Sequence, residues 1–235
     1  MQLEDVLSEL KAFGSESTKK TFINHGAIEP VWGVKVGDMK TIVKKIKNDQ
    51  KLAMRLYDTG ISDAMYLAGL LANGSKMTKT ELKKWAENSG WYMISEYTVP
   101  WVACESQFAE ELALEWIDSN NELIASSGWN TFSGLVSTKP DSELDLNLYK
   151  QILERVEKNI HNAKNRVRYS MNTFVISLGS GVASLTDAAM AVAIKNGKII
   201  VNMGNTACRV PYAPEYLQKI IDMGRVGLKR KTMKC

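Results

Sequence analysis

The stretch NSGWYMISEYTVPWVACE, residues 88–105, concentrates the side chains of this sequence that could do chemistry. If residues 91–104 are helical, Tyr92 and Glu96 lie one turn apart on one face. A ring beside a carboxylate suits a planar cation, because the ring offers a π-face and the carboxylate offers charge. N-alkylated purines are such cations. As their glycosidic bond breaks, a fixed carboxylate can stabilise the positive charge that develops on the sugar.

The same stretch also has a purely structural interpretation. Its aromatic side chains could pack between neighbouring helices, while its two Glu residues pair with lysines or cap a helix. Pro100 should kink or end the helix nearby, because proline lacks the backbone N–H. Periodicity alone leaves both interpretations open, since one rotation of the helix decides whether Glu96 faces a groove or the core.

The composition suits a water-soluble protein with a large core. The chain has 235 residues, of which 45% are hydrophobic, and a formal net charge of +4. It contains no run of about 18 apolar residues and no basic, apolar start typical of a signal peptide. We therefore expect a soluble, cytoplasmic protein of bacterial type. Cys104, Cys208 and Cys235 should be reduced thiols, and no zinc-ligand spacing is present, so we expect no metal.

Helical periodicity dominates the chain, and only KIIVNM (198–203) resembles a strand. Asp38 is a candidate N-cap for a helix that begins at Met39. The expected helices span about 3–13, 39–46, 51–58, 62–72, 79–87, 91–104, 107–119, 121–137, 145–160, 164–178, 184–195 and 213–223. These elements predict an all-α protein.

Short sequence matches recur at a spacing of about 40 residues. SGWYMIS (89–95) resembles SGWNTFS (127–133), and WNTFSGLVS (129–137) resembles MNTFVISLGS (171–180). A period near 40 with two helices per unit indicates a right-handed α-solenoid of HEAT-like repeats. We expect one such domain over residues 1–224, followed by a basic tail over 225–235.

Basic residues are clustered in three places. Such clusters attract polyanions such as DNA, although solvated helix faces and a frayed tail would give the same pattern. The clusters are Lys40, Lys44, Lys45, Lys47 and Lys51; Lys164, Arg166 and Arg168; and Arg225, Lys229, Arg230, Lys231 and Lys234.

Several segments, taken in order, resemble the DNA alkylation repair family of HEAT-like glycosylases, the AlkD-like proteins. The resemblance covers most of the chain. Its segments are VWGVKVGDMKTIVKKI (31–46), SDAMYLAGLL (62–71), the aromatic stretch 91–96, NRVRYSMNTFV (165–175), GKIIVNMGNTACRVPYA (197–213) and the tail KRKTMKC.

The resemblance implies roles for particular residues. The catalytic Asp of the family matches Glu96, and the Trp one turn earlier matches Tyr92, with Trp91 beside it. Two features of the family are missing. Its groove Arg falls in ASSGWNT, where Ser126, Ser127 and Asn130 stand, and its second groove Trp falls at Asn172 and Thr173. Trp129 could replace the missing ring if it faces the groove, or it could be core.

Two main functions follow, and both take double-stranded DNA as the partner. The first is hydrolysis of the glycosidic bond of N3- or N7-alkylated purines by a monomeric enzyme without metal or organic cofactor. Tyr92 and Glu96 would then be catalytic, and Trp91 and Trp129 would contact DNA. The second is a non-catalytic module that binds bent, branched or damaged DNA; a protein-binding scaffold is a third possibility. The phosphate-binding residues would be Lys35, Lys40, Arg166, Arg168, Lys229, Arg230 and Lys231.

Overall fold

The computed structural model describes residues 1–46 and 49–234, so Lys47 and Cys235 lie outside the described residues. Contacts between Cα atoms divide the chain into two compact units. Unit 1 contains Met1–Phe108, Met203–Ala207 and Lys234, and unit 2 contains Ala109–Asn202 and Cys208–Met233. Every regular element of the described residues is helical, as the periodicity predicts.

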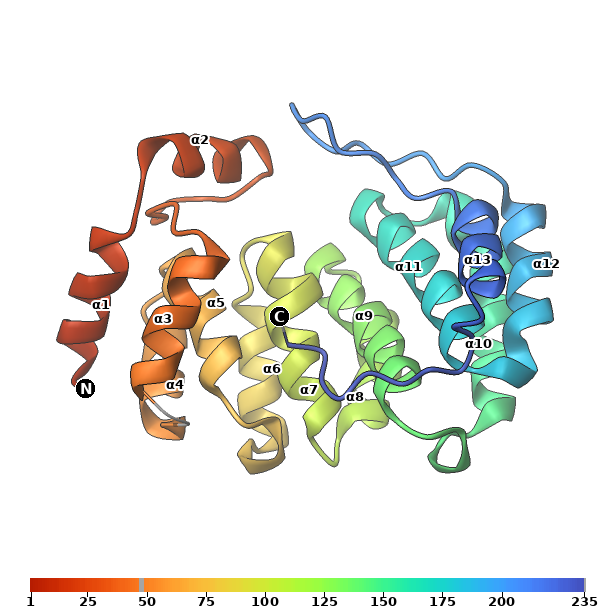
Figure 1. Ribbon diagram of the computed structural model, residues 1–235, viewed down its shortest axis with the longest axis horizontal. Helices are drawn as coiled ribbons and strands as arrows, with labels where there is room; N and C mark the ends of the chain where they lie inside the picture. Colours follow the sequence, from red (N-terminus) through yellow and green to blue (C-terminus); the bar gives the residue numbers. More distant parts are fainter. Residues whose placement is uncertain (47–48, 235) are drawn as a thin grey trace. The chain divides into compact units, whose positions relative to one another are not determined.

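The described residues of unit 1 form seven α-helices and two shorter helical turns (Figure 1). In chain order they are α1 (Leu3–Ala12), α2 (Glu16–Asn24), α3 (Val36–Ile46), α4 (Gln50–Tyr57), α5 (Ser62–Leu71), η1 (Gly74–Lys76), α6 (Lys79–Glu87), η2 (Ile94–Thr98) and α7 (Val99–Glu105). Helix α5 is buried along almost its whole length, and α4 and α6 pack through apolar faces such as Leu52, Leu56 and Leu82. Burial of these faces stabilises helices that are too short to be stable alone.

Local side-chain bonds fix where the helices of unit 1 begin. Asp49 caps α4 by accepting from the N–H of Leu52 at 3.0 Å, and Thr78 and Glu81 form a reciprocal capping box on α6. Asp63, buried in the first turn of α5, accepts from the N–H groups of Trp32 and Val34 at 2.5 and 2.7 Å. This carboxylate therefore ties the segment before α3 to α5.

A stacked aromatic pair lies at the contact of α4 with α6. The rings of Tyr57 and Trp85 are 3.9 Å apart and nearly parallel. The Tyr57 hydroxyl donates to the Trp85 carbonyl, and burial raises the pKa of Tyr57 well above its ordinary value. Both side chains belong to the core of unit 1.

Unit 2 is built from six α-helices and three 3₁₀ turns. They are α8 (Ala109–Ile117), α9 (Glu122–Thr138), η3 (Asp141–Glu143), α10 (Leu146–Asn159), η4 (Ile160–Asn162), α11 (Asn165–Gly181), η5 (Ala183–Leu185), α12 (Thr186–Asn196) and α13 (Ala213–Asp222). Phe132, Tyr149 and Phe174, from α9, α10 and α11, form a cluster of buried rings with centroids 5.8–6.4 Å apart. This cluster is the centre of the core of unit 2.

Two expectations about elements are wrong, and one helix was not predicted. Helix α3 begins at Val36, so Asp38 lies in its first turn and does not precede it. No residue of 198–203 is a strand; the segment is extended chain between α12 and α13. Helix α2 is capped by Ser15 and was not expected, because none of its residues is buried and its sequence therefore lacks an apolar stripe.

None of the helices in the described part of the chain has the length and apolarity needed to cross a membrane. The expectation of a single domain over 1–224 remains a prediction, since the two units are each compact in themselves.

Candidate nucleic-acid interface

The predicted catalytic helix contains a π-helical turn. The N–H of Val99 donates to the carbonyl of Ile94, five residues earlier, and η2 covers Ile94–Thr98. Pro100 explains why the turn widens here. It has no N–H to give the carbonyl of Glu96, and it is tolerated because it lies at the second residue of α7. Turns of this kind shift the side chains that follow relative to a regular helix.

Glu96 lies inside unit 1. Its residue surface is only 4% exposed, and it stands in the middle of η2 between Ser95 and Tyr97. Trp101 is 2% exposed and packs edge-on against Tyr66, with the ring centroids 5.2 Å apart. Most of the stretch 91–105 is therefore core, as its structural interpretation predicts.

Trp91 and Tyr92 contact the end of α2. The Nε1 of Trp91 donates to the His25 carbonyl at 2.8 Å, and its ring packs against Phe22 at 5.3 Å. Trp91 is 4% exposed, whereas Tyr92 is half-buried. The hydroxyl of Tyr92 lies 2.8 Å from Nδ1 of His25. Trp91 is thus a core residue, and Tyr92 keeps part of its ring accessible. Nothing in the sequence indicated that His25, one of two histidines in the chain, would contact Trp91 and Tyr92.

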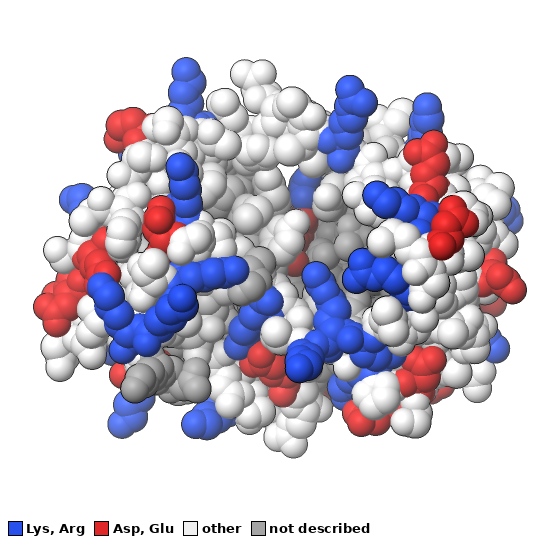
Figure 2. All heavy atoms as spheres, viewed as in Figure 1, with Lys and Arg blue, Asp and Glu red and all other residues white. Residues whose placement is uncertain are grey.

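Lys35 and the described residues of the first basic cluster are on the surface of unit 1. Lys35 and Lys40 are exposed, and neither ammonium has a hydrogen-bond or ion-pair partner among the described residues. Figure 2 shows Lys and Arg side chains gathered over α3. Lys45, by contrast, is paired with Glu9 at 2.5 Å. Lys35 and Lys40 can therefore meet a phosphate without first breaking an ion pair.

The two predicted arginines of α11 are occupied within unit 2. Arg166 is 9% exposed, and its guanidinium lies over the ring of Tyr169 at 4.5 Å. Arg168 donates to the carbonyls of Ala163 and Ile200 at 2.7 and 3.1 Å. Both side chains therefore have partners within unit 2, and their expected role in holding phosphates stays a prediction.

Trp129 is a core residue. It is 1% exposed and lies 5.7 Å from Phe174, so it does not stand as a groove wall. The guanidinium of Arg155 covers it at 5.9 Å, at a cleft of about 430 Å³ in unit 2. The alternative that Trp129 is core, left open by the sequence, is the observed one.

Polar residues at the positions of the two missing family residues make structural contacts. Asn130 donates to the Ser126 carbonyl and to the Ser170 hydroxyl at 2.9 and 2.8 Å. Asn172 donates to the carbonyl of Pro211 at 2.9 Å. Ser126 and Ser127 are buried in α9. Asn130 and Asn172 thus join α9 to α11 and α11 to the chain before α13, and none of these four side chains presents a ring or a cation.

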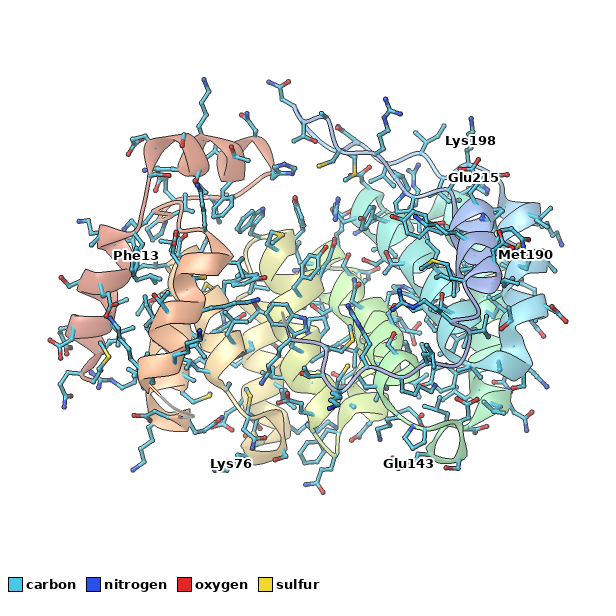
Figure 3. The ribbon with its side chains drawn as sticks, in the orientation of Figure 1. Phe13, Lys76, Glu143, Met190, Lys198 and Glu215 are labelled. Atoms are coloured by element: carbon cyan, nitrogen blue, oxygen red, sulfur yellow. The ribbon has the colours of Figure 1, made fainter. Side chains whose placement is uncertain are left out.

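An extended arm connects α12 to α13, and we define it as residues 198–212 (Figure 1). Asn165 fixes its outgoing leg through two bonds with the backbone of Asn202, at 2.9 and 2.7 Å. Lys198 and Glu215 mark the base of the arm in Figure 3, where its two legs and α13 line a cleft of about 640 Å³. The first turns of α11 therefore serve as an anchor for the arm.

The C-terminal tail is ordered and held to unit 2 by its backbone. The N–H groups of Gly227 and Arg230 donate to the carbonyls of Ser180 and Ser137, both at 2.8 Å. Lys229 bonds the Val136 carbonyl at 2.8 Å and pairs with Asp141 at 2.7 Å. The tail thus satisfies carbonyls at the C-terminal ends of α9 and α11. Arg230 and Lys231 are exposed, whereas Lys229 is structurally engaged.

No group of three or more His, Cys, Asp and Glu side chains that could hold a metal ion occurs among residues 1–46 and 49–234.

Packed helices, exposed basic residues and an aromatic stretch buried in unit 1 are features of a HEAT-like repeat protein. The family model for "DNA alkylation repair enzyme" matches residues 6–217. This chain belongs to that family, and the family resemblance expected from the sequence is confirmed.

Three similar proteins give the comparison more detail. Uncharacterized proteins of Listeria monocytogenes and Listeria innocua are 34% and 32% identical over 218 residues, which cover 90% of this chain and 94% of each relative. A solved structure superposes with a TM-score of 0.92 at 37% identity, covering all of both chains. That structure represents a new family of proteins related to the HEAT-like repeat DNA glycosylases with affinity for branched DNA structures. The predicted all-α, HEAT-like fold is thereby confirmed.

Proposed function

We propose that this protein binds branched DNA and does not excise bases. The observation that carries this proposal is the solved relative, which matches the whole chain and belongs to a family with affinity for branched DNA structures. At 37% identity over the full length, the likeness concerns side chains as well as fold. The partner proposed is therefore double-stranded DNA whose path is branched or distorted.

The accessible cations support recognition through the backbone of DNA. Lys35 and Lys40 in unit 1, and Arg230 and Lys231 in unit 2, are exposed and have no partner among the described residues. Phosphate contacts of this kind position a protein without reading base sequence. A preference for branched DNA would then come from its shape and the spacing of its phosphates.

The state of the predicted catalytic residues argues against base excision. A carboxylate must approach the anomeric carbon of the sugar to stabilise its cation, and Glu96 is 4% exposed. Trp91 and Trp129 are also buried, so neither ring is available to stack on a lesion. The chemistry expected of the stretch 88–105 thus lacks access to its substrate.

The test is equilibrium binding to a four-way junction at several salt concentrations, with Lys35→Gln and Lys40→Gln variants. Each lysine that contacts a phosphate contributes about 0.9 to the slope of log K against log salt, so its loss should lower the slope by about 1. Lys84→Gln is the matched control, because Lys84 is a cation of the same unit already paired with Asp58 at 2.7 Å. Equal slopes in all four proteins would contradict this assignment of phosphate contacts.

Excision of N3- or N7-alkylated purines is the second candidate function. The family model describes a repair enzyme, and the half-buried ring of Tyr92 precedes Glu96 by four residues. The test is base release from N-methyl-N-nitrosourea-treated DNA by wild type and by Glu96→Gln. Release by wild type that Glu96→Gln abolishes would establish this function and overturn our first proposal. No release by a wild-type sample that binds junctions would exclude it.

We also propose that the protein acts as a cytoplasmic monomer on the nucleoid. Light scattering coupled to size exclusion should give one chain of 26.2 kDa per particle. A dimer mass would contradict this part of the proposal.

A further inference from the structure

A cavity in unit 2 combines cations with apolar side chains. It has a volume of about 460 Å³, within the range of roughly 300–1,000 Å³ typical of small-molecule sites. Helix α11 contributes Ser177 and Ser180. Helix α13 contributes Tyr216 and Ile220, and Met223 follows its last residue. The tail contributes Arg225, Leu228 and Arg230. None of the residues lining it is acidic.

The two arginines at this cavity are available to a ligand. Arg225 and Arg230 are exposed, and neither guanidinium has a hydrogen-bond or ion-pair partner within 1–46 and 49–234. Their backbones are nevertheless fixed. The N–H of Arg225 donates to the Ile220 carbonyl at 3.1 Å, next to Gly224 with φ +61°, and that of Arg230 donates to Ser137 at 2.8 Å. The backbone is thus held in place while two anion-binding side chains stay free.

The tail offsets part of the negative C-terminal ends of α9 and α11 beside this cavity. Carbonyls at the C-termini of α9 and α11 would repel an anion, but tail groups already occupy several of them. Gly227 bonds the Ser180 carbonyl, Arg230 bonds that of Ser137, and Lys229 bonds that of Val136, all at 2.8 Å. Figure 2 shows Lys and Arg side chains gathered over this tail.

Residues 216–223 give the cavity an apolar, partly exposed part of its lining. Helix α13 buries Ala213 and Leu217 in the core of unit 2, while Tyr216 and Met223 are each 52% exposed at the cavity. An exposed ring offers a π-face for stacking, and a thioether adapts to the shape of a flat ligand. A ligand that contacts both the arginines and these apolar side chains has an anion at one end and a planar ring at the other.

We propose that this cavity binds a nucleotide, with its phosphate between Arg225 and Arg230 and its base against Tyr216 and Met223. Guanidinium groups bind phosphate oxygens through paired, charge-assisted hydrogen bonds. Such a nucleotide can be free in solution, or it can be an unpaired nucleotide of a DNA strand. The site does not depend on Glu96 or on the cations of unit 1.

The test is titration of the full-length protein with deoxyadenosine 5′-monophosphate and with a short single-stranded oligonucleotide. Deoxyadenosine carries only the base and inorganic phosphate only the anion. Each should therefore bind at least about tenfold more weakly than the nucleotide. Arg225→Gln combined with Arg230→Gln should weaken nucleotide binding by at least about tenfold. Tyr216→Ala should weaken binding of the nucleotide but not of phosphate.

Two further variants keep the outcome interpretable. Lys219→Gln removes a cation from the same helix outside the cavity and should leave nucleotide affinity unchanged. Arg225→Lys with Arg230→Lys keeps the charge and removes the planar fork, so its affinity should fall between those of the wild type and the Gln pair.

The source of the nucleotide follows from which probe binds. Binding of the free nucleotide identifies a small-molecule site, whereas binding of the oligonucleotide alone identifies an unpaired nucleotide of DNA. If neither probe binds, or if binding survives the double Gln variant, the proposal is overturned. Arg230 is also one of the cations proposed to contact DNA, so the proposed function is judged from junction binding by the wild-type protein alone. Failure of one proposal is then distinguishable from failure of the other.

Discussion

Glu96 shows that the chemical type of a residue does not determine what it can do. Its carboxylate and the ring of Tyr92 match a site for a cationic base in type and spacing. Glu96 lies within the π-helical turn that accommodates Pro100, and it is 4% exposed inside unit 1. A carboxylate can act on a substrate only if the substrate can reach it. Whether it can depends on which way the helix turns the side chain.

Trp91 offers a test of the structural interpretation at the residue scale. Trp91→Phe should lower the free energy of unfolding by about 1–3 kcal/mol, because the part-buried His25 carbonyl loses its donor and the core loses part of the buried indole ring. Tyr92→Phe is the comparison variant and should cost less, because water can replace a partner of its half-buried hydroxyl. Urea unfolding of both variants measures the difference. A smaller loss for Trp91→Phe than for Tyr92→Phe would mean that Trp91 is not the core contact described.

At the element scale, the two copies of Ser-Gly-Trp have different backbones. Gly90 has a φ of +57° and precedes the helical turn, whereas Gly128 lies inside α9. The shared tripeptide is therefore not a structural repeat at this point. The two Asn-Thr-Phe copies do have the same local structure. Both lie in the middle of long helices, and Phe132 and Phe174 are both fully buried.

Gly128 marks a close approach of α9 to α8. A Cβ added there would lie 2.8 Å from the N of Ile117 and 2.9 Å from the carbonyl oxygen of Ala113. Gly128→Ala should therefore lower the free energy of unfolding by about 1–3 kcal/mol, since backbone must move. A Cβ added at Gly37, in the first turn of α3, would meet no neighbouring atom within 4 Å. Gly37→Ala should therefore leave the free energy of unfolding unchanged or raise it by up to about 1 kcal/mol. Similar thermal midpoints for the two variants would contradict the close packing of α8 on α9.

Asn165 offers a test of how the arm is held. Asn165→Ala removes both side-chain bonds to Asn202, so the outgoing leg of the arm should open more often. Hydrogen exchange of the Asn202 amide should become about tenfold faster or more, because each tenfold corresponds to about 1.4 kcal/mol. Exchange within α9 serves as the internal control and should not change. An unchanged rate at Asn202 would show that other contacts hold the arm.

The elements differ in how far the sequence predicts them. Helices α4, α5 and α6 were expected within about one residue of their ends, because each has an apolar face that periodicity reveals. Helix α2 buries none of its residues and so has no such signal. KIIVNM has the composition of a strand, but Asn165 and Arg168 bind the backbone at Asn202 and Ile200 in place of a partner strand. Such tertiary contacts are not visible in local sequence.

At the scale of the whole molecule, charge was easier to predict than the site. The net charge of +4 and the basic clusters are properties of the sequence itself. Which cations are free depends on long-range partners: Arg166 lies over Tyr169 and Lys229 pairs with Asp141, whereas Lys40 has no partner among the described residues. Only the three-dimensional structure therefore distinguishes cations that are free from cations that have a partner.

The central claim is that this protein recognises branched DNA by shape and charge. The most direct measurement is competition, in which a labelled four-way junction bound to wild-type protein is displaced by an unlabelled junction or by a linear duplex of the same total length and composition. Our account predicts that the junction competes at least about tenfold more strongly at near-physiological salt. Equal competition by the linear duplex would contradict the claim and leave only general affinity for polyanions.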